Sequence, residues 1–508
     1  MGAPKEQGRI KLAQLTIADL LNQGKFVVPV FSAFRRGRSG SPKKVSVTDI
    51  LMHHQAFVAQ QPSFREGMKV IRQRLVDTHY TLIKDLKLEQ NEALRKEIDK
   101  DINNLCNLIM FSCRAYEAVP STNDVITTGG ERLAVKVISA YLNRKHAKGE
   151  FPMRTAPVTA LELGLYTDNQ FGSASIDWAR AVDHSREVIV GQYLQRNLLP
   201  VVTGFDGIYD PNNEFKDLMA TDYEPEQTME EGYTGVYRTS LGRGGSDLTA
   251  TFLGMALNAE YVGFCKDTPG VLTGDDMLVG PAAETVAELD YELATEAGNI
   301  YSRAVEPVRH TNVPIHIFDP ARPSKRTIVS NVQLPAGLYI IERPLEAVNI
   351  QSTGISGEPG ALLDFLQHFA IRNISVEEIR HQRSGTDCIV CGDPDSIHQL
   401  VDELNQLGFH SQAHFTWYIR VVGNITEELS ATFNEFMLDF EPLTLSTYQI
   451  GTKVVTATVA RNRAGGRLGE AARIGGITQR IHDELLSPVV MHRSREMAAV
   501  PDTSVPAK

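Results

Sequence analysis

A glycine-rich run near the middle of the chain carries groups that could hold an amino acid beside a phosphate. The run is Thr239-Ser-Leu-Gly-Arg-Gly-Gly-Ser-Asp-Leu-Thr-Ala250. Glycines allow backbone N–H groups to turn inward and approach a ligand, which makes an anion-binding nest. Arg243 can grip a carboxylate through two parallel hydrogen bonds, and Asp247 can pair with an ammonium group. The same composition is also typical of an ordinary surface turn.

The apolar residues that follow this run favour a ligand-binding role over a surface turn. Leu248-Thr-Ala-Thr-Phe-Leu-Gly-Met-Ala-Leu257 reads as a buried helix that begins directly after Asp247. The glycines would then lie at a helix N-terminus, where backbone N–H groups and the helix dipole attract anions.

The first part of the chain, residues 10–330, alternates short apolar strands with longer helical patterns. The strand-like runs are 26–32, 199–203, 260–264 and 313–318, and helical patterns include 92–117 and 185–196. This alternation predicts an α/β domain with a mostly parallel sheet covered by helices. Ligands bind beyond the carboxyl ends of such strands, and each polar loop of interest follows a strand.

A different pattern begins at about residue 331. Prolines and a glycine indicate a linker over 331–346. Two copies of a strand–helix–strand–strand–helix unit of about 70 residues follow, at 347–412 and 413–487, which is an internal repeat. The last residues, 488–508, are expected to be disordered.

Composition excludes several classes of function. The 508 residues carry a net charge of −11 without a basic block, so nucleic acid is not an expected partner. No apolar run approaches the ~20 residues of a membrane span, and no signal-peptide core is present. Five cysteines in so long a chain favour a reducing cytoplasm. Cys388 and Cys391 form a CxxC pair without the further ligands of a zinc site, so we interpret them as structural.

Seven segments, in order, resemble motifs of the aspartate kinases, enzymes of the amino-acid kinase fold. They are Phe31-Ser-Ala33, Thr48-Asp49-Ile-Leu51, Thr128-Gly-Gly-Glu-Arg-Leu133, Leu165-Tyr-Thr-Asp-Asn-Gln-Phe-Gly172, Val202-Thr-Gly-Phe-Asp-Gly207, the run 239–250 and Lys266-Asp-Thr-Pro-Gly-Val-Leu-Thr-Gly-Asp275. The last resembles the nucleotide-binding pattern Thr-Asp-Val-x-Gly-Val-x-Thr-x-Asp. The tandem repeat resembles paired ACT regulatory modules, so the resemblance covers nearly the whole chain.

The resemblance implies a three-layer αβα kinase domain at 1–330, followed by ferredoxin-like βαββαβ ACT modules. It also implies phosphorylation of the side-chain carboxylate of L-aspartate by ATP, with Mg²⁺ carried by the nucleotide. By resemblance, Arg243 would hold the α-carboxylate, Asp247 the α-ammonium, and Glu131 would help orient the substrate. Ser32, Thr48 and Ser246 would contact the substrate, backbone groups of Gly244 and Gly245 would face the transferred phosphate, and Lys266, Asp267 and Asp275 would line the nucleotide.

The departures from the family pattern concern cations for the phosphates. The family opens with a strand and Lys-Phe-Gly-Gly-Thr-Ser, whereas this sequence opens Met1-Gly-Ala-Pro-Lys-Glu6. The run Asp275-Asp276-Met277 lacks the usual proline and cation, and no Lys or Arg lies between Thr268 and Ser302. Each lost charge donor typically costs about 10²–10³ in rate.

Three hypotheses therefore stay open. The chain is an aspartate kinase whose start lies upstream or which uses Lys5, Arg303 or the basic insert Arg35–Lys44; or it is an amino-acid-binding regulatory paralogue; or it is a related acyl-phosphate kinase. The ACT resemblance implies feedback control by lysine or threonine, for which the loop Ser356–Gly360 at a helix N-terminus is the candidate site. A purely dimer-forming role for the repeats is the alternative, and a homodimer or higher homo-oligomer is expected.

Overall fold

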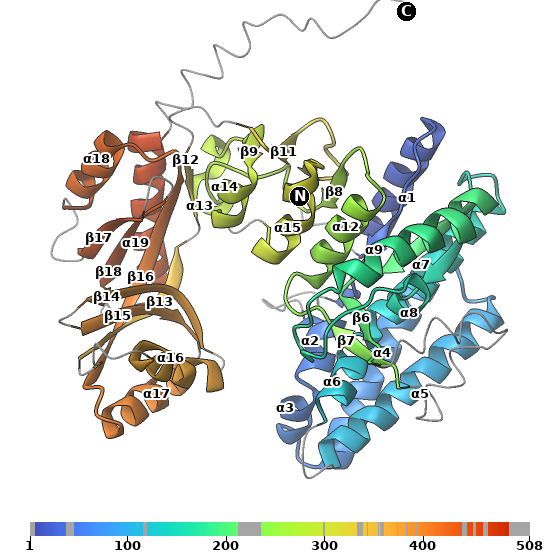
Figure 1. The fold of residues 1–508 in the computed structure, drawn as a ribbon, viewed down its shortest axis with the longest axis horizontal. Coiled ribbons are helices and arrows are strands. Elements are labelled where there is room, and N and C mark those ends of the chain that lie inside the picture. The colour runs from blue at the N-terminus through green and yellow to red at the C-terminus, as the bar shows by residue number, and fades with distance from the viewer. Residues whose placement is uncertain are drawn as a thin grey trace, which may run out of the picture. The chain divides into compact units, whose positions relative to one another are not determined.

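The computed structural model describes most of the chain (Figure 1). The described residues are 6–36, 45–114, 119–211, 235–297, 300–332 and, within 339–486, all but 343, 354, 356–359, 373, 383–384, 393, 439–443, 451–453 and 461–465. Lys5, most of the basic insert, the candidate effector loop at 356–359 and the tail at 488–508 lie outside the described residues. None of the described helices is long and apolar enough to cross a membrane.

The chain divides into two compact units, and each unit is made of two separate segments of the sequence. One unit contains Met1–Pro269 and Ile300–Asn331, and the other contains Gly270–Asn299 and Val332–Lys508. The predicted kinase domain at 1–330 was continuous, whereas here a stretch of about 30 of its residues packs with the C-terminal part. The chain passes from the first unit to the second after Pro269, which lies inside the predicted nucleotide motif.

Short parallel strands form the framework of the first unit. Strands β1 (Val30–Phe31), β5 (Leu198–Thr203) and β4 (Arg154–Val158) pair in the order β1-β5-β4, all parallel. Strand β8 (Val262–Cys265) pairs in parallel with β10 (Ile315–Phe318), which pairs antiparallel with β11 (Arg326–Ser330). A hairpin of β6 (Asp206–Tyr209) and β7 (Tyr237–Ser240) follows β5. The mostly parallel α/β prediction is confirmed.

Helices enclose these strands (Figure 1). They are α1 (Glu6–Asn22), α2 (Val47–Met52), α3 (His54–Ala59), α4 (Phe64–Asp85), α5 (Glu92–Arg114), α6 (Pro120–Thr127), α7 (Gly129–His146), α8 (Ala160–Leu163), α9 (Trp178–Glu187), α12 (Gly245–Ala256) and α15 (Ser302–Thr311). Helix α5 buries one stripe of apolar residues spaced three and four apart, as an amphipathic surface helix does. Helix α7 is buried over most of its circumference, which indicates a central position in the unit.

The second unit is built on one antiparallel sheet. Its strands β13 (Leu345–Ser352), β14 (Ser375–Gln382), β15 (Gly385–Cys391), β16 (Ser411–Gly423), β17 (Thr444–Ile450) and β18 (Val454–Ala460) take the order β14-β15-β13-β16-β18-β17. Residues 411–418 of β16 pair with β13, and residues 416–422 pair with β18. The two predicted repeats therefore share one long strand, and the predicted boundary at 412/413 falls inside it. Strand β12 (Tyr339–Ile341), within the predicted linker, also pairs with β16.

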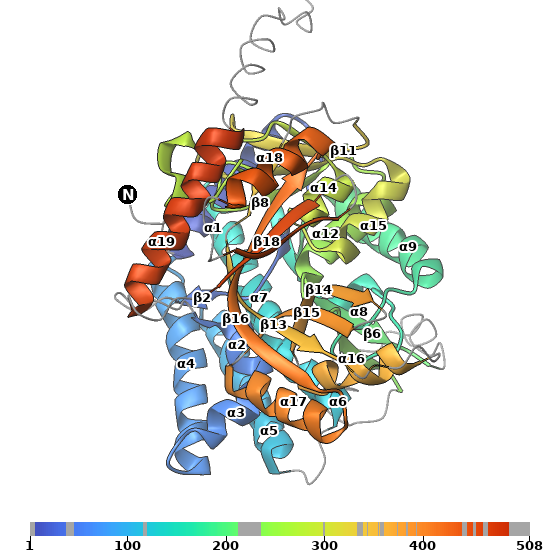
Figure 2. The same ribbon diagram turned by 90° about the vertical axis from the view of Figure 1, so that its left-hand side faces the viewer.

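Helices cover one face of this sheet (Figure 2). Helices α16 (Ala361–Ile371) and α17 (Pro394–Gln406) pack on β13 and β15, and α18 (Glu427–Leu438) and α19 (Gly466–Arg480) pack on β16 and β18. Segment 270–299 adds α13 (Asp276–Val279) and α14 (Tyr291–Glu296), and α14 is tied to β16 by an ion pair between Glu296 and Arg420. The first repeat, β13-α16-β14-β15-α17-β16, is the βαββαβ pattern expected of an ACT module.

We predict that Phe365→Ala lowers the stability of the second unit. Phe365 is fully buried on α16, with Phe369 and Phe409 ring centroids at 5.1 and 5.3 Å. The cavity should cost about 3–5 kcal/mol of unfolding free energy. The chain's two tryptophans lie in different units, so urea unfolding in a Trp178→Phe background reports on Trp417 alone. Leu363→Ala, on the same helix but 72% exposed, is the matched control and should change little.

Candidate active site

The glycine-rich loop lies where the sequence predicted, at the N-terminus of a buried helix. Strand β7 ends at Ser240 and α12 begins at Gly245. Gly242 and Gly244 have φ of +73° and +75°, a left-handed conformation that side chains rarely adopt. A Cβ on Gly244 would also lie 2.3 Å from the ring of Tyr301. The backbone of the loop therefore requires glycine at both positions, and the predicted helix is confirmed.

The turn after β5 packs directly against the first turn of α12. A Cβ on Gly204 would lie 2.5 Å from Ser246 Oγ and 2.8 Å from Ser246 Cα. Phe205 takes a positive φ of 69°, and its carbonyl accepts a hydrogen bond from Leu241 N at 3.0 Å. Ser32, which follows β1, donates from Oγ to Ser246 Oγ at 2.7 Å. Loops after two parallel strands and the loop into α12 thus converge at one edge of the sheet.

Arg243 is exposed and oriented by an aromatic side chain. Its Nε donates to Tyr301 Oη at 2.8 Å, and its guanidinium carbon lies 5.5 Å from the centre of the Tyr301 ring. This contact uses Nε, and two terminal nitrogens together can bind a carboxylate through parallel hydrogen bonds. The sequence singled out Arg243 but not Tyr301, which lies 58 residues away in the chain.

Asp247 already binds an ammonium group. Lys266 Nζ lies 3.1 Å from Asp247 Oδ2 and 3.4 Å from Oδ1. Lys266 directly follows β8, and its backbone N–H donates to Phe318 O at 2.9 Å, which extends the pairing with β10. The two residues assigned by resemblance to substrate and nucleotide are therefore direct neighbours.

Glu131 is a buried carboxyl that joins two loops. It lies in the first turn of α7 and is 2% exposed. Its Oε1 accepts from Thr48 Oγ1 at 3.1 Å and from Ala33 N at 3.3 Å, whereas Oε2 has no hydrogen-bond partner among the described residues. Burial raises the pKa of Glu131 to about 8, although these hydrogen bonds lower it. Gly130 permits the close packing, because a Cβ there would lie 2.9 Å from Ala33 Cβ.

Two further side chains, Asp124 and Arg303, form hydrogen bonds to the backbone of the loops around the site. Asp124 Oδ2 accepts from the backbone N–H groups of Gly172 (2.9 Å) and Ser240 (2.7 Å), and burial raises its pKa to about 6. Arg303 donates to Leu241 O at 2.9 Å and Ala174 O at 2.6 Å. Asp124 has no recognisable motif around it, so its role was not predictable from the sequence. Arg303, considered there as a cation for phosphate, here bonds backbone carbonyls.

The remaining predicted residues have other contacts. Gly245 packs on Phe205, and a Cβ at this position would lie 2.8 Å from the Phe205 ring. Asp267, next to Lys266, pairs with Arg9 of α1 at 3.1 Å. Asp275 belongs to the second unit, where its side chain accepts from Met277 N at 2.8 Å and caps α13. In the described part of the chain, no group of three or more His, Cys, Asp or Glu side chains is arranged to hold a metal ion.

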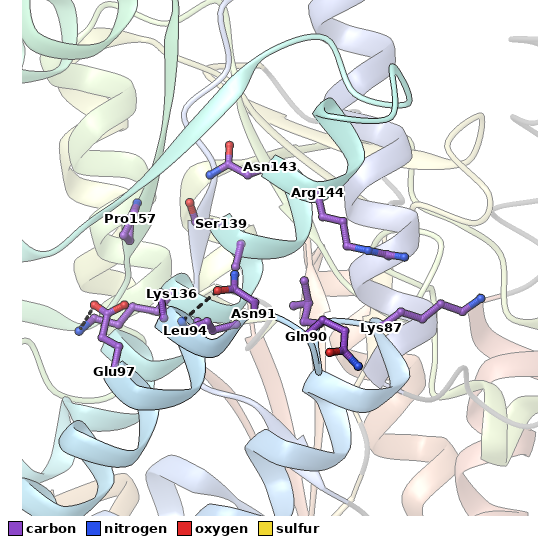
Figure 3. A pocket seen from close by; sticks show the side chains of 13 residues that line it. Lys87, Gln90, Asn91, Leu94, Glu97, Lys136, Ser139, Asn143, Arg144 and Pro157 are labelled. Atoms are coloured by element: carbon purple, nitrogen blue, oxygen red, sulfur yellow. Dashed lines mark hydrogen bonds and ion pairs between the residues drawn. The ribbon is translucent and has the colours of Figure 1, made fainter.

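A hollow of about 510 Å³ lies elsewhere on the first unit, between α5, the turn before it and α7 (Figure 3). Several of its polar side chains are already paired: Lys136 contacts Glu97 at 2.8 Å and Asp101 at 2.9 Å, and Asn143 bonds the backbone of Thr155. It contains none of the predicted site residues, and we do not assign it to the reaction.

An α/β unit with a glycine-rich loop at a helix N-terminus is the architecture of an amino-acid kinase domain, and the second unit contains a βαββαβ repeat. The model of the Amino acid kinase family matches residues 6–319, and the chain belongs to that family. The chain is 27% identical over 342 residues to aspartokinase 2, chloroplastic, of Arabidopsis thaliana, and 26% identical over 375 residues to aspartokinase 3, chloroplastic, of the same plant. These alignments cover 64% and 69% of this chain, and it spans only 57% and 61% of those relatives.

Solved structures share the fold across almost the whole chain. E. coli aspartokinase III in complex with lysine and aspartate has a TM-score of 0.66 at 21% identity, covering 94% of this chain and 96% of that one. The same enzyme in complex with aspartate and ADP has a TM-score of 0.65 at 19% identity and equal coverage. The predicted combination of a kinase domain and ACT-type modules is confirmed as the fold.

We predict that Glu131→Gln stabilises the protein more at pH 7.5 than at pH 5. The folded-state pKa is raised, from 4.5 to about 8, so between these values Glu131 ionises in the unfolded chain but stays protonated in the folded one. Stability is therefore lost as pH rises, by about 1.4 kcal/mol per unit. Glutamine cannot ionise, so its advantage should grow by about 3 kcal/mol over this interval.

Urea unfolding at both pH values measures this difference. Glu89→Gln, at an exposed turn, is the control and should show no such growth. A Glu131→Gln advantage that is the same at pH 5 and pH 7.5 would show that the buried carboxyl ionises normally.

Proposed function

We propose that the protein is an aspartate kinase, which transfers the γ-phosphoryl group of MgATP to the side-chain carboxylate of L-aspartate and forms 4-phospho-L-aspartate. The observation that carries this proposal is that a cation, Arg243, and a carboxylate, Asp247, both lie at one glycine-rich helix N-terminus. Family membership and the named relatives support it. This reaction opens lysine, threonine and methionine biosynthesis.

The loop residues supply complementary groups for both ends of the substrate. The terminal nitrogens of Arg243 would bind the α-carboxylate, while Asp247, which here holds the ammonium of Lys266, would bind the α-ammonium. The hydroxyls of Ser32 and Ser246 lie together beside this loop. Glu131 accepts hydrogen bonds from Thr48 and from the backbone of Ala33, the residue after Ser32. We propose that Glu131 and Thr48 orient the substrate.

The reaction needs positioning and charge neutralisation rather than a base. A side-chain carboxylate oxygen of aspartate attacks the γ-phosphorus, a new P–O bond forms, and the bond to the β-phosphate oxygen breaks to release ADP. No proton moves, because the substrate carboxylate is already ionised. The N–H group of Gly244 and the dipole of α12 favour the anionic phosphoryl group, whereas the N–H of Gly245 already donates to Gly242 O at 2.9 Å. We propose that Lys266 and Asp267 line the nucleotide and that Mg²⁺ arrives with it.

A hydroxylamine trap for acyl phosphate tests the proposal. Wild-type protein with ATP, Mg²⁺ and L-aspartate should form the hydroxamate, and Arg243→Gln should lower kcat/KM for aspartate by about 10²–10³, because a charge-assisted contact is lost in the site. Arg196→Gln, an exposed arginine of the same unit, is the control. No product from wild-type protein that nevertheless binds aspartate would favour the regulatory paralogue, and product with another amino acid only would favour the related acyl-phosphate kinase.

We also propose that the second unit makes the enzyme sensitive to lysine or threonine, in a cytoplasmic homodimer or larger homo-oligomer. The support is the ACT-type fold and the resemblance of the repeat; the E. coli enzyme named above was solved with lysine bound. Adding lysine, threonine or both to the assay should lower the rate. An unchanged rate under all three conditions would contradict control by these effectors, and the sedimentation velocity of the full chain measures the assembly.

A further inference from the structure

We propose that Lys266 occupies the ammonium-binding position on Asp247 until the amino-acid substrate arrives. The substrate's own ammonium group then displaces Lys266, which becomes available to the phosphates of the nucleotide. This inference rests on the proposed function, and it adds a coupling between the two substrates. Binding of the amino acid would prepare the site for the nucleotide.

The geometry permits exchange of the lysine without movement of the backbone. Lys266 N is held by Phe318 O at 2.9 Å, and Asp247 lies in the first turn of a 12-residue helix. The lysine side chain is 35% exposed and Asp247 is 22% exposed, so the ion pair reaches solvent. Lysine has a flexible four-carbon stem with a single charge at its end. Only that stem has to move.

Electrostatics favours displacement by the substrate. An ion pair that is partly exposed contributes little free energy, so a competitor can replace Lys266 on Asp247 at low cost. An α-amino acid would bind Asp247 through its ammonium and Arg243 through its carboxylate. It would therefore make two charge-assisted contacts, whereas Lys266 makes one with Asp247. Two ammonium groups at one carboxylate repel each other, which moves Lys266 away. Asp247 lies in the first turn of α12, so the released lysine is close to a helix N-terminus that attracts the phosphates it would bind.

Neighbouring charges leave Lys266 suited to this role. The adjacent carboxylate, Asp267, is paired with Arg9 at 3.1 Å. Arg303 is bonded to backbone carbonyls of the loops around the site. Lys266 also stands at the position where the motif it resembles has threonine, so this cation is a property of this chain.

The exchange predicts that aspartate and nucleotide strengthen each other's binding, because linkage is reciprocal. Calorimetric titration of the full chain with MgADP should give a dissociation constant about fivefold lower in saturating L-aspartate than without it. Succinate has both carboxylates of aspartate but no ammonium group, so it should give no such gain.

The variant Lys266→Met distinguishes displacement of Lys266 from Asp247 from a role in which Lys266 only lines the nucleotide. The variant should show no gain in MgADP affinity when aspartate is added. It should also bind aspartate more tightly than wild type in the absence of nucleotide, because Asp247 has lost its competitor. A lysine that only lined the nucleotide would leave the affinity for aspartate unchanged. Lys25→Met is the matched control, since Lys25 is also 35% exposed and paired with a carboxylate, that of Glu260.

The outcomes distinguish this inference from the proposed function. Aspartate binding and kinase activity in the wild type, with MgADP affinity independent of aspartate or with the full gain retained in Lys266→Met, would overturn the exchange and leave the kinase assignment intact. Wild-type protein that binds no aspartate would overturn both. A gain of equal size with succinate would show that the ammonium group is not the trigger.

Discussion

The candidate site depends on the contact between the turn after β5 and the first turn of α12. Gly204 has no side chain, and any Cβ there would overlap Ser246. This absence lets the end of a parallel strand reach the N-terminus of a buried helix, where Ser32 adds a hydroxyl bridge from the neighbouring strand. The groups that would meet the substrate therefore lie on loops fixed at both ends, and the loop from Gly242 to Asp247 needs little ordering when a ligand binds.

The charged groups of the site lie in two different environments. Arg243, Asp247 and Lys266 are partly or fully exposed, so their contacts are weak enough to be exchanged for ligand contacts. Glu131 is buried with one oxygen unpartnered among the described residues, and its raised pKa makes it costly at neutral pH. A buried group that lowers stability and lies beside the substrate loop is typical of a site shaped for function rather than for folding.

Local features of the sequence predicted the loop, while non-local pairings stayed hidden. The glycines and the apolar run after Asp247 specify a turn and a helix within 20 residues, so their placement could be read directly. The ion pair of Lys266 with Asp247 and the hydrogen bond of Arg243 to Tyr301 join residues far apart in the chain. The tandem repeat was visible as a pattern, but the sharing of β16 is decided by strand pairing. The packing of residues 270–299 with the second unit had no local signal either.

The central claim is that the substrate's side-chain carboxylate is itself the nucleophile towards ATP. L-Aspartate labelled with ¹⁸O in that carboxylate, incubated with the protein and MgATP, can be followed by ³¹P NMR. The account predicts an acyl phosphate whose phosphorus signal shows the isotope shift of one bridging ¹⁸O atom. ADP formation with unlabelled inorganic phosphate as the only phosphorylated product would contradict it, because water would then be the acceptor.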